Sequence, residues 1–125
     1  MKQFIEKIII KTGSREILNI TKTIEDRVNK SDINDGLLNL SILHTSCSLM
    51  IQENADSTVM IDIKNFLEKI APEDNYLHDT EGPDDMPAHL KSLLTQSNLT
   101  MSVKQKKILL GTWQGIFLLE HRYQQ

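Results

Sequence analysis

The stretch LLNLSILHTSCSLMIQ, residues 37–52, alternates apolar and polar side chains over most of its length. Such alternation predicts β-strands, because successive residues of a strand point to opposite faces of a sheet. We expect one strand over residues 37–44 and a second over residues 46–52. Their core-facing side chains are Leu38, Leu40 and Ile42 in the first strand, and Cys47, Leu49 and Ile51 in the second.

The segments on either side predict further strands mixed with helices. Alternation or dense β-branching predicts strands over residues 3–11, 98–103, 108–113 and 116–123. Helical spacing predicts a helix over residues 20–29, an amphipathic helix after a cap at Asp56, and a short helix after Asp84 or Asp85. We assign the short helix the apolar face Met86, Leu90, Leu93 and Leu94. The pattern predicts a single α+β domain over residues 1–125, with a largely antiparallel β-sheet core and two or three helices.

The bulk composition excludes several classes of protein. The chain has 125 residues, a formal net charge of −3 and one cysteine. This charge balance does not favour binding to nucleic acid or to an anionic membrane, and a lone cysteine forms no intrachain disulfide. No stretch approaches the length of a membrane span, and the N-terminus carries charge too often for a signal peptide. We therefore expect a cytoplasmic protein.

The segment YLHDTEGPDDMPAH, residues 76–89, concentrates imidazoles and carboxylates in a loop that leads into the short helix. His78 stands beside Asp79, a carboxylate that could orient its ring, and His89 lies in the first helical turn. His44 extends the apolar face of its strand, so we expect it to point inward and to meet His78 and His89. Each histidine could instead be a hydrogen-bonded structural residue.

Three imidazoles from distant segments could hold a metal, although their spacing matches no known zinc motif. The candidate cofactor is a divalent ion: imidazoles favour zinc, whereas carboxylates and water favour magnesium. No organic cofactor is expected. Cys47 is a candidate nucleophile, but its odd separation from His44 favours a small buried side chain.

Further polar residues lie at the ends of predicted strands. Asp56 is explained as a helix cap, whereas Asn54 could be a ligand contact or a solvated side chain. Trp113 lies between two glycines, which indicates either a ligand approach or a β-bulge with the ring packed in the core. Arg122 is a candidate phosphate-binding residue, and an ion pair with Glu120 is the alternative.

Three motifs, LHTSCSLMIQENAD, HDTEGPDDMPAHLKSLL and LGTWQGIFLLEHR, together resemble the YjbQ-like family, often described as secondary thiamine-phosphate synthase. The motifs occur in the right order, and the resemblance spans nearly the whole chain. It implies a compact α+β fold that packs as a homotrimer. The family motif carries onto His44, Asn54, Asp56, His78, Asp79, Gly82, Asp85, His89, Trp113, Gln114, Glu120 and Arg122.

The resemblance also implies a function and a division of roles. The expected activity is a weak transferase reaction that joins a pyrimidine pyrophosphate to a thiazole phosphate. We assign catalysis to His44, His78, Asp79 and His89, with the three histidines as metal ligands. We assign contacts with a small phosphorylated substrate to Asn54, Asp56, Trp113, Gln114, Glu120 and Arg122. The alternatives are a metal-dependent hydrolase and a non-enzymatic trimer that binds a metal or an anion.

Overall fold

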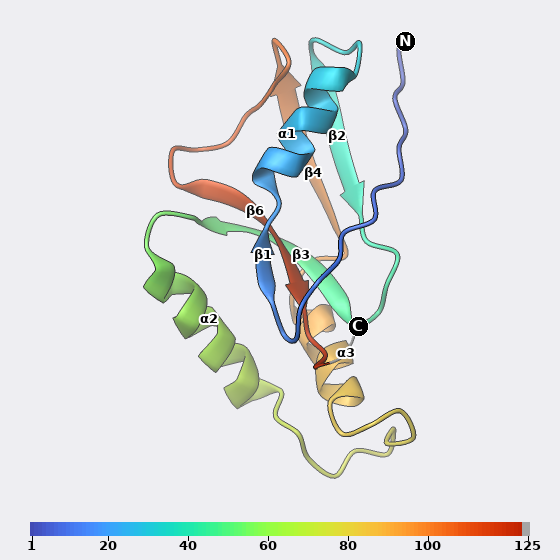
Figure 1. The fold of residues 1–125 in the computed structure, drawn as a ribbon, viewed down its shortest axis with the longest axis vertical. Coiled ribbons are helices and arrows are strands. Elements are labelled where there is room, and N and C mark those ends of the chain that lie inside the picture. The colour runs from blue at the N-terminus through green and yellow to red at the C-terminus, as the bar shows by residue number, and fades with distance from the viewer. Residues whose placement is uncertain (124–125) are drawn as a thin grey trace.

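The computed structural model describes residues 1–123 and contains two antiparallel sheets with three helices (Figure 1). The elements, in chain order, are β1 (Ile17–Asn19), α1 (Thr21–Lys30), β2 (Gly36–Ser41), β3 (Cys47–Glu53), α2 (Ser57–Ile70), α3 (Asp85–Leu94), β4 (Asn98–Lys104), β5 (Lys107–Ile108) and β6 (Gln114–Glu120). One sheet has the order β1-β6-β3 and the other has the order β2-β4-β5. The α+β prediction is therefore confirmed.

The two strands predicted from residues 37–52 form, but they belong to different sheets. β2 pairs with β4, with Leu38 opposite Met101, whereas β3 pairs with β6, with Cys47 opposite Glu120. An isolated bridge between Leu49 and Gln96 links β3 to the chain just before β4. The connection between β2 and β3 therefore turns the chain from one sheet into the other.

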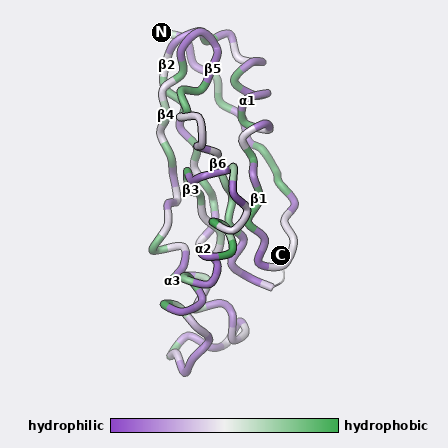
Figure 2. Tube along the Cα trace, turned by 90° about the vertical axis from the view of Figure 1, so that its left-hand side faces the viewer, coloured by the Kyte–Doolittle hydropathy of each residue, from purple (hydrophilic) through white to green (hydrophobic). Residues whose placement is uncertain are grey.

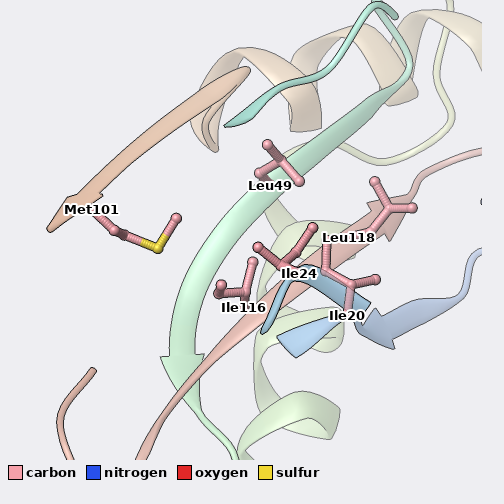
Figure 3. Close-up of a cluster of buried hydrophobic side chains, with 6 residues drawn as sticks. All are labelled: Ile20, Ile24, Leu49, Met101, Ile116 and Leu118. Atoms are coloured by element: carbon pink, nitrogen blue, oxygen red, sulfur yellow. The ribbon is translucent and has the colours of Figure 1, made fainter. Parts of the chain in front are cut away.

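The core lies where the two sheets meet α1. Figure 3 shows its buried cluster, which consists of Ile20, Ile24, Leu49, Met101, Ile116 and Leu118. Leu38, Leu40 and Ile42, the side chains predicted to face the core, pack against this cluster. The alternation therefore placed the apolar residues on the correct face of the strand. Burying one Ile or Leu side chain stabilises a fold by about 1.5–3 kcal/mol, so these residues carry much of the stability.

Two predicted strands are corrected by the structure. Residues 3–11 form no strand, although Ile8 and Ile10 pack against the core. The alternation of apolar residues provides these packing contacts, but a strand also needs a neighbouring strand for its backbone hydrogen bonds. The strand expected over residues 108–113 shrinks to β5. The chain then turns, with the Gly111 carbonyl accepting from Gln114 N at 3.0 Å.

The structure also excludes the core-packed alternative for Trp113 and corrects the apolar face predicted for α3. The indole of Trp113 is 62% exposed, so it is no part of the core. Leu93 and Leu94 of α3 are exposed, and the helix instead buries Ala88 together with two charged residues, Asp85 and Lys91. Buried charges need partners, and ion pairs provide them here.

The loop of residues 72–84 lies at one end of the molecule and is mostly hydrophilic (Figure 2). It connects α2 to α3, as expected from its proline, glycine and acidic residues. Asp56 caps α2 by accepting a hydrogen bond from Thr58 N at 2.9 Å, which confirms the capping prediction. Within residues 1–123, none of the three helices has the length and apolar run required to cross a membrane.

Candidate metal centre

Three side chains from the loop of residues 72–84 and from α3 converge on one point. His78 Nε2 lies 2.6 Å from Asp85 Oδ2, and His89 Nε2 lies 3.1 Å from the same oxygen. One potential ligand atom from each residue lies within 4.8 Å of the other two. We call these three residues the His-Asp-His cluster.

Local structure places two members of the cluster on one helix face. Asp85 is the first residue of α3 and His89 follows one turn later, a spacing that brings side chains together on a helix surface. His78 comes from the preceding loop, and its ring centroid lies 5.5 Å from that of His89. The Asp85 side chain is 3% exposed, whereas the two imidazoles are 41% and 30% exposed. The cluster therefore has a buried carboxylate and a solvent-accessible side.

A backbone contact fixes the tautomer of His89. Its Nδ1 lies 2.9 Å from the Thr45 carbonyl oxygen, and a carbonyl can only accept, so Nδ1 carries a proton. In a neutral ring Nε2 then has a lone pair that faces the Asp85 carboxylate. Two lone pairs at this distance repel each other unless a proton or a metal cation lies between them. A histidine held in this way by a carbonyl is typical of metal ligands.

The acidity of Asp85 reflects opposing influences. Burial disfavours its charged form, but the hydrogen bond from His78 and the charges of His89 and Arg122 outweigh it, so the Asp85 pKa lies below its usual range. The carboxylate is ionised at neutral pH and is available as a ligand.

Asp79, which the sequence pairs with His78, is exposed, and the carboxylate in contact with His78 is Asp85 instead. The sequence predicts Asp84 or Asp85 as the cap of the short helix, and Asp85 is not among the predicted metal ligands. The spacing of Asp85 and His89, four residues apart at a helix start, was the signal that could have identified it.

His44 does not point inward as expected. It is exposed in the connection between β2 and β3, where its Nδ1 lies 3.0 Å from Ser46 Oγ. It is absent from the His-Asp-His cluster, the one group of potential metal ligands found within residues 1–123. Its neighbour Thr45 nevertheless holds His89, so the structure brings this connection to the edge of the cluster.

Arg122 holds the loop before α3 and does not pair with Glu120 through its side chain. Its guanidinium bonds to the Glu81 carbonyl, to Asp84 and to Asp85. Glu120 is buried and accepts from Thr12 Oγ1 at 2.9 Å and from Cys47 Sγ at 3.3 Å.

Cys47 is half-buried between the sheet and Glu120. Burial, together with the neighbouring Glu120, raises the pKa of the Cys47 thiol to about 12. A thiol with so high a pKa is protonated at neutral pH and is a poor nucleophile. The structure therefore favours the alternative in which Cys47 is a small packed side chain.

The remaining predicted site residues lie at the other end of the β3–β6 ladder. Glu53 pairs with Gln114 there, and Asn54 N donates to the Trp113 carbonyl at 2.9 Å. The six residue steps of β3 between Cys47 and Glu53 span about 20 Å. Within one chain, Asn54, Trp113 and Gln114 are therefore separated from the cluster, and Asp56 lies just beyond them as the cap of α2.

Comparison with known proteins supports the resemblance noted in the sequence. The family model described as "UPF0047 protein YjbQ-like" matches residues 6–125. A UPF0047 protein of Synechocystis is 42% identical over 123 residues, covering 97% of this chain and 84% of that protein. The UPF0047 protein YjbQ of Salmonella typhimurium is 46% identical over 105 residues, covering 82% of this chain and 76% of that protein.

A solved structure shows the same fold. The crystal structure of an uncharacterized YjbQ/UPF0047 family protein from Clostridium acetobutylicum superposes with a TM-score of 0.83 at 32% identity. The match covers 90% of this chain and 87% of that one. The family match over nearly the whole chain, the similarity of the relatives and the shared fold agree: the chain belongs to the YjbQ-like UPF0047 family.

Proposed function

We propose that the His-Asp-His cluster binds a divalent metal ion and that the protein uses it in a transferase reaction on a small phosphorylated substrate. The observation that carries the proposal is the orientation of His89, whose Nε2 lone pair faces a buried carboxylate because its Nδ1–H donates to the Thr45 carbonyl. Two imidazoles and one carboxylate suit zinc or another transition metal better than magnesium. The family resemblance adds the reaction: a pyrimidine pyrophosphate joined to a thiazole phosphate, giving thiamine phosphate.

In this reaction, the residues of the cluster would bind the metal, and two residues outside it would act on the substrate. His78, Asp85 and His89 would hold the metal, which when bound would supply positive charge for the oxygens of a departing pyrophosphate. His44 is exposed and precedes Thr45, whose carbonyl accepts from His89, and it would transfer a proton or contact a phosphate. Asp79 lies on the same loop as His78 and is a second candidate proton carrier.

A homotrimer would explain how the distant residues could contribute. Two hollows in the described surface lie along α2 and near the turn of residues 12–16, and neither is lined by a residue of the cluster. Three large apolar side chains, Leu43 before His44 and Leu93 and Leu94 in the last turn of α3, are between 55% and 79% exposed. We propose that a neighbouring subunit covers them and brings its Asn54, Trp113 and Gln114 to the substrate. Light scattering should then give about three times the chain mass of 14.3 kDa.

A metal assay tests the proposal most directly. Purified protein should contain about one equivalent of a divalent metal per chain, and His89→Ala and His78→Ala should lose it. His44→Ala is the matched control, because it removes an imidazole beside the cluster but outside it. It should keep the metal and lose turnover. Loss of metal in His44→Ala would make His44 a ligand, and a metal-free wild type that cannot be reloaded would contradict the proposal.

Turnover should be measured with the two phosphorylated precursors, before and after chelation. The hydrolase alternative is favoured by the solvent-exposed side of the cluster, where water could reach a bound metal. It predicts phosphate release from one precursor without a joined product. Metal binding without turnover of either kind would support the non-enzymatic alternative.

A further inference from the structure

The side chain of Arg122 reaches from the end of β6 to the loop before α3. Its Nη2 donates to the Glu81 carbonyl at 2.6 Å and to Asp84 Oδ1 at 3.1 Å. Its Nε lies 3.4 Å from Asp84 Oδ2, and its Nη1 lies 3.2 Å from Asp85 Oδ1. All three guanidinium nitrogens are thus engaged by the chain itself, which argues against the phosphate-binding role expected from the sequence.

The two oxygens of Asp85 have different partners. Oδ1 meets the guanidinium of Arg122, whereas Oδ2 meets both imidazoles. The terminal torsion of an aspartate is soft, so a carboxylate with partners on one oxygen only can rotate. Partners on both oxygens fix the rotation and hold Oδ2 towards His78 and His89.

The charge of Arg122 is cancelled locally. A guanidinium this close to a ligand carboxylate would repel a divalent cation, but Asp84 forms a two-point pair with it and is itself buried. Asp84, Asp85 and Arg122 together carry a net charge of −1, the charge of a single ligand carboxylate. The arrangement therefore adds orientation without adding net positive charge.

We propose that Arg122 is a positioning residue for the His-Asp-His cluster: it orients the Asp85 carboxylate, while Asp84 neutralises it. This inference deepens the proposed function and rests on it. It also assigns a role to the last described residues, since Tyr123 N donates to Asp84 Oδ2 at 2.9 Å and closes the same network.

The experiment separates orientation from charge by metal titration against a chromophoric chelator. The double variant D84N/R122Q keeps the local charge of −1 but lacks the guanidinium, and R122K keeps the charge but lacks the planar fork. We expect both to bind Zn²⁺ about 10–100-fold more weakly than wild type, the usual effect of losing a residue that orients a ligand. R27Q, which loses an ion pair with Glu6 on the surface, is the control and should bind as wild type.

If Arg122 acted through charge alone, R122Q would bind Zn²⁺ more tightly than wild type and D84N/R122Q would match wild type. That result would overturn the inference. R122K provides the test if the double variant fails to fold, and circular dichroism of each variant establishes that it has folded.

A second measurement does not depend on metal binding. In metal-free protein, long-range ¹H–¹⁵N spectra of the imidazoles should show shifted or broadened signals for His78 and His89 in D84N/R122Q. The signals of His121, which contacts Ser48, should stay unchanged. Unaltered His78 and His89 signals would overturn the positioning role of Arg122, whether or not the wild type binds metal. A wild type that binds no metal would contradict only the proposed function.

Discussion

Nδ1 of His89 donates a hydrogen bond of 2.9 Å to the carbonyl oxygen of Thr45, across 44 residues of sequence. The contact joins α3 to the connection between the two sheets. Because the acceptor is a backbone atom, the tautomer of His89 depends on how the sheets place this connection and not on which side chain stands at position 45.

Asp85→Asn should remove metal binding and weaken the fold. An asparagine carries no charge to pair with Arg122, and its amide nitrogen cannot accept the hydrogen bond from His78, so we expect a loss of about 1–3 kcal/mol in the free energy of unfolding. Asp79→Asn is the matched control, because Asp79 is exposed, and it should leave stability and metal content unchanged. Equal effects of the two substitutions in urea denaturation would show that Asp85 has no special role.

Gly82→Ala should disturb the loop that holds His78. Gly82 has a φ of 107°, which an L-residue adopts only with strain, and an added Cβ would lie 3.3 Å from Asp84 Oδ1. Strained backbone costs about 1–3 kcal/mol, so both the melting temperature and the metal affinity should fall. Gly36→Ala, where only an Ile33 methyl lies close, serves as the comparison. A larger loss in Gly36→Ala would contradict this account.

Trp113→Ala and Ile116→Ala should differ sharply in stability. Trp113 is exposed, so its truncation should change the free energy of unfolding by no more than about 0.5 kcal/mol. Ile116 is fully buried in the core, and its truncation should cost about 2–5 kcal/mol. If Trp113→Ala abolishes turnover while the protein stays folded, Trp113 is a substrate contact. A large destabilisation would instead show that its ring is covered in the assembled protein.

Stability should fall as the pH drops below neutral because of His121. Burial, helped by the charges of Lys91 and Arg15, lowers the pKa of His121 from 6.5 to about 4. Between these values the unfolded chain binds a proton that the folded chain does not. The stabilisation is therefore complete above pH 6.5 and declines towards pH 4, by up to about 3 kcal/mol.

His121→Gln is the control for this prediction, because glutamine can still bond to Ser48 Oγ but does not titrate. Urea denaturation at several pH values should give a shallower pH dependence for the variant than for the wild type. If the free energy of unfolding depends on pH in the same way in the variant and the wild type, groups other than His121 cause the loss of stability.

Glu68→Gln should destabilise the protein more than the double substitution Glu68→Gln with Lys91→Met. Glu68 pairs with both Arg15 and Lys91, and the Lys91 side chain is 3% exposed. Removing the carboxylate alone leaves the buried ammonium of Lys91 without this counter-charge, whereas the double substitution also replaces that ammonium with an apolar chain of similar size. A double-mutant cycle measured by thermal melting checks whether the single variant is less stable than the double variant. Additive effects of the two substitutions would contradict an interaction between Glu68 and Lys91.

Local patterns in the sequence determined several of the elements that the chain forms. The alternation at residues 37–52 placed β2 and β3, the spacing of apolar residues placed α1, and Asp56 marked the start of α2. Each of these signals acts between near neighbours, so it can be read without knowing the rest of the fold. The motifs shared with the family likewise predicted His78 and His89 as site residues, and the structure brings the two together.

Only the tertiary structure decided which of these residues meet. It placed β2 and β3 in different sheets, left His44 exposed and outside the cluster, and made Asp85 the partner of His78 in place of the adjacent Asp79. Sheet pairing and side-chain contact depend on segments that lie far apart in the sequence, and period and spacing carry no information about such pairings. For the same reason, the contact of Arg122 with Asp84 and Asp85, across nearly 40 residues, is a property of the folded chain alone.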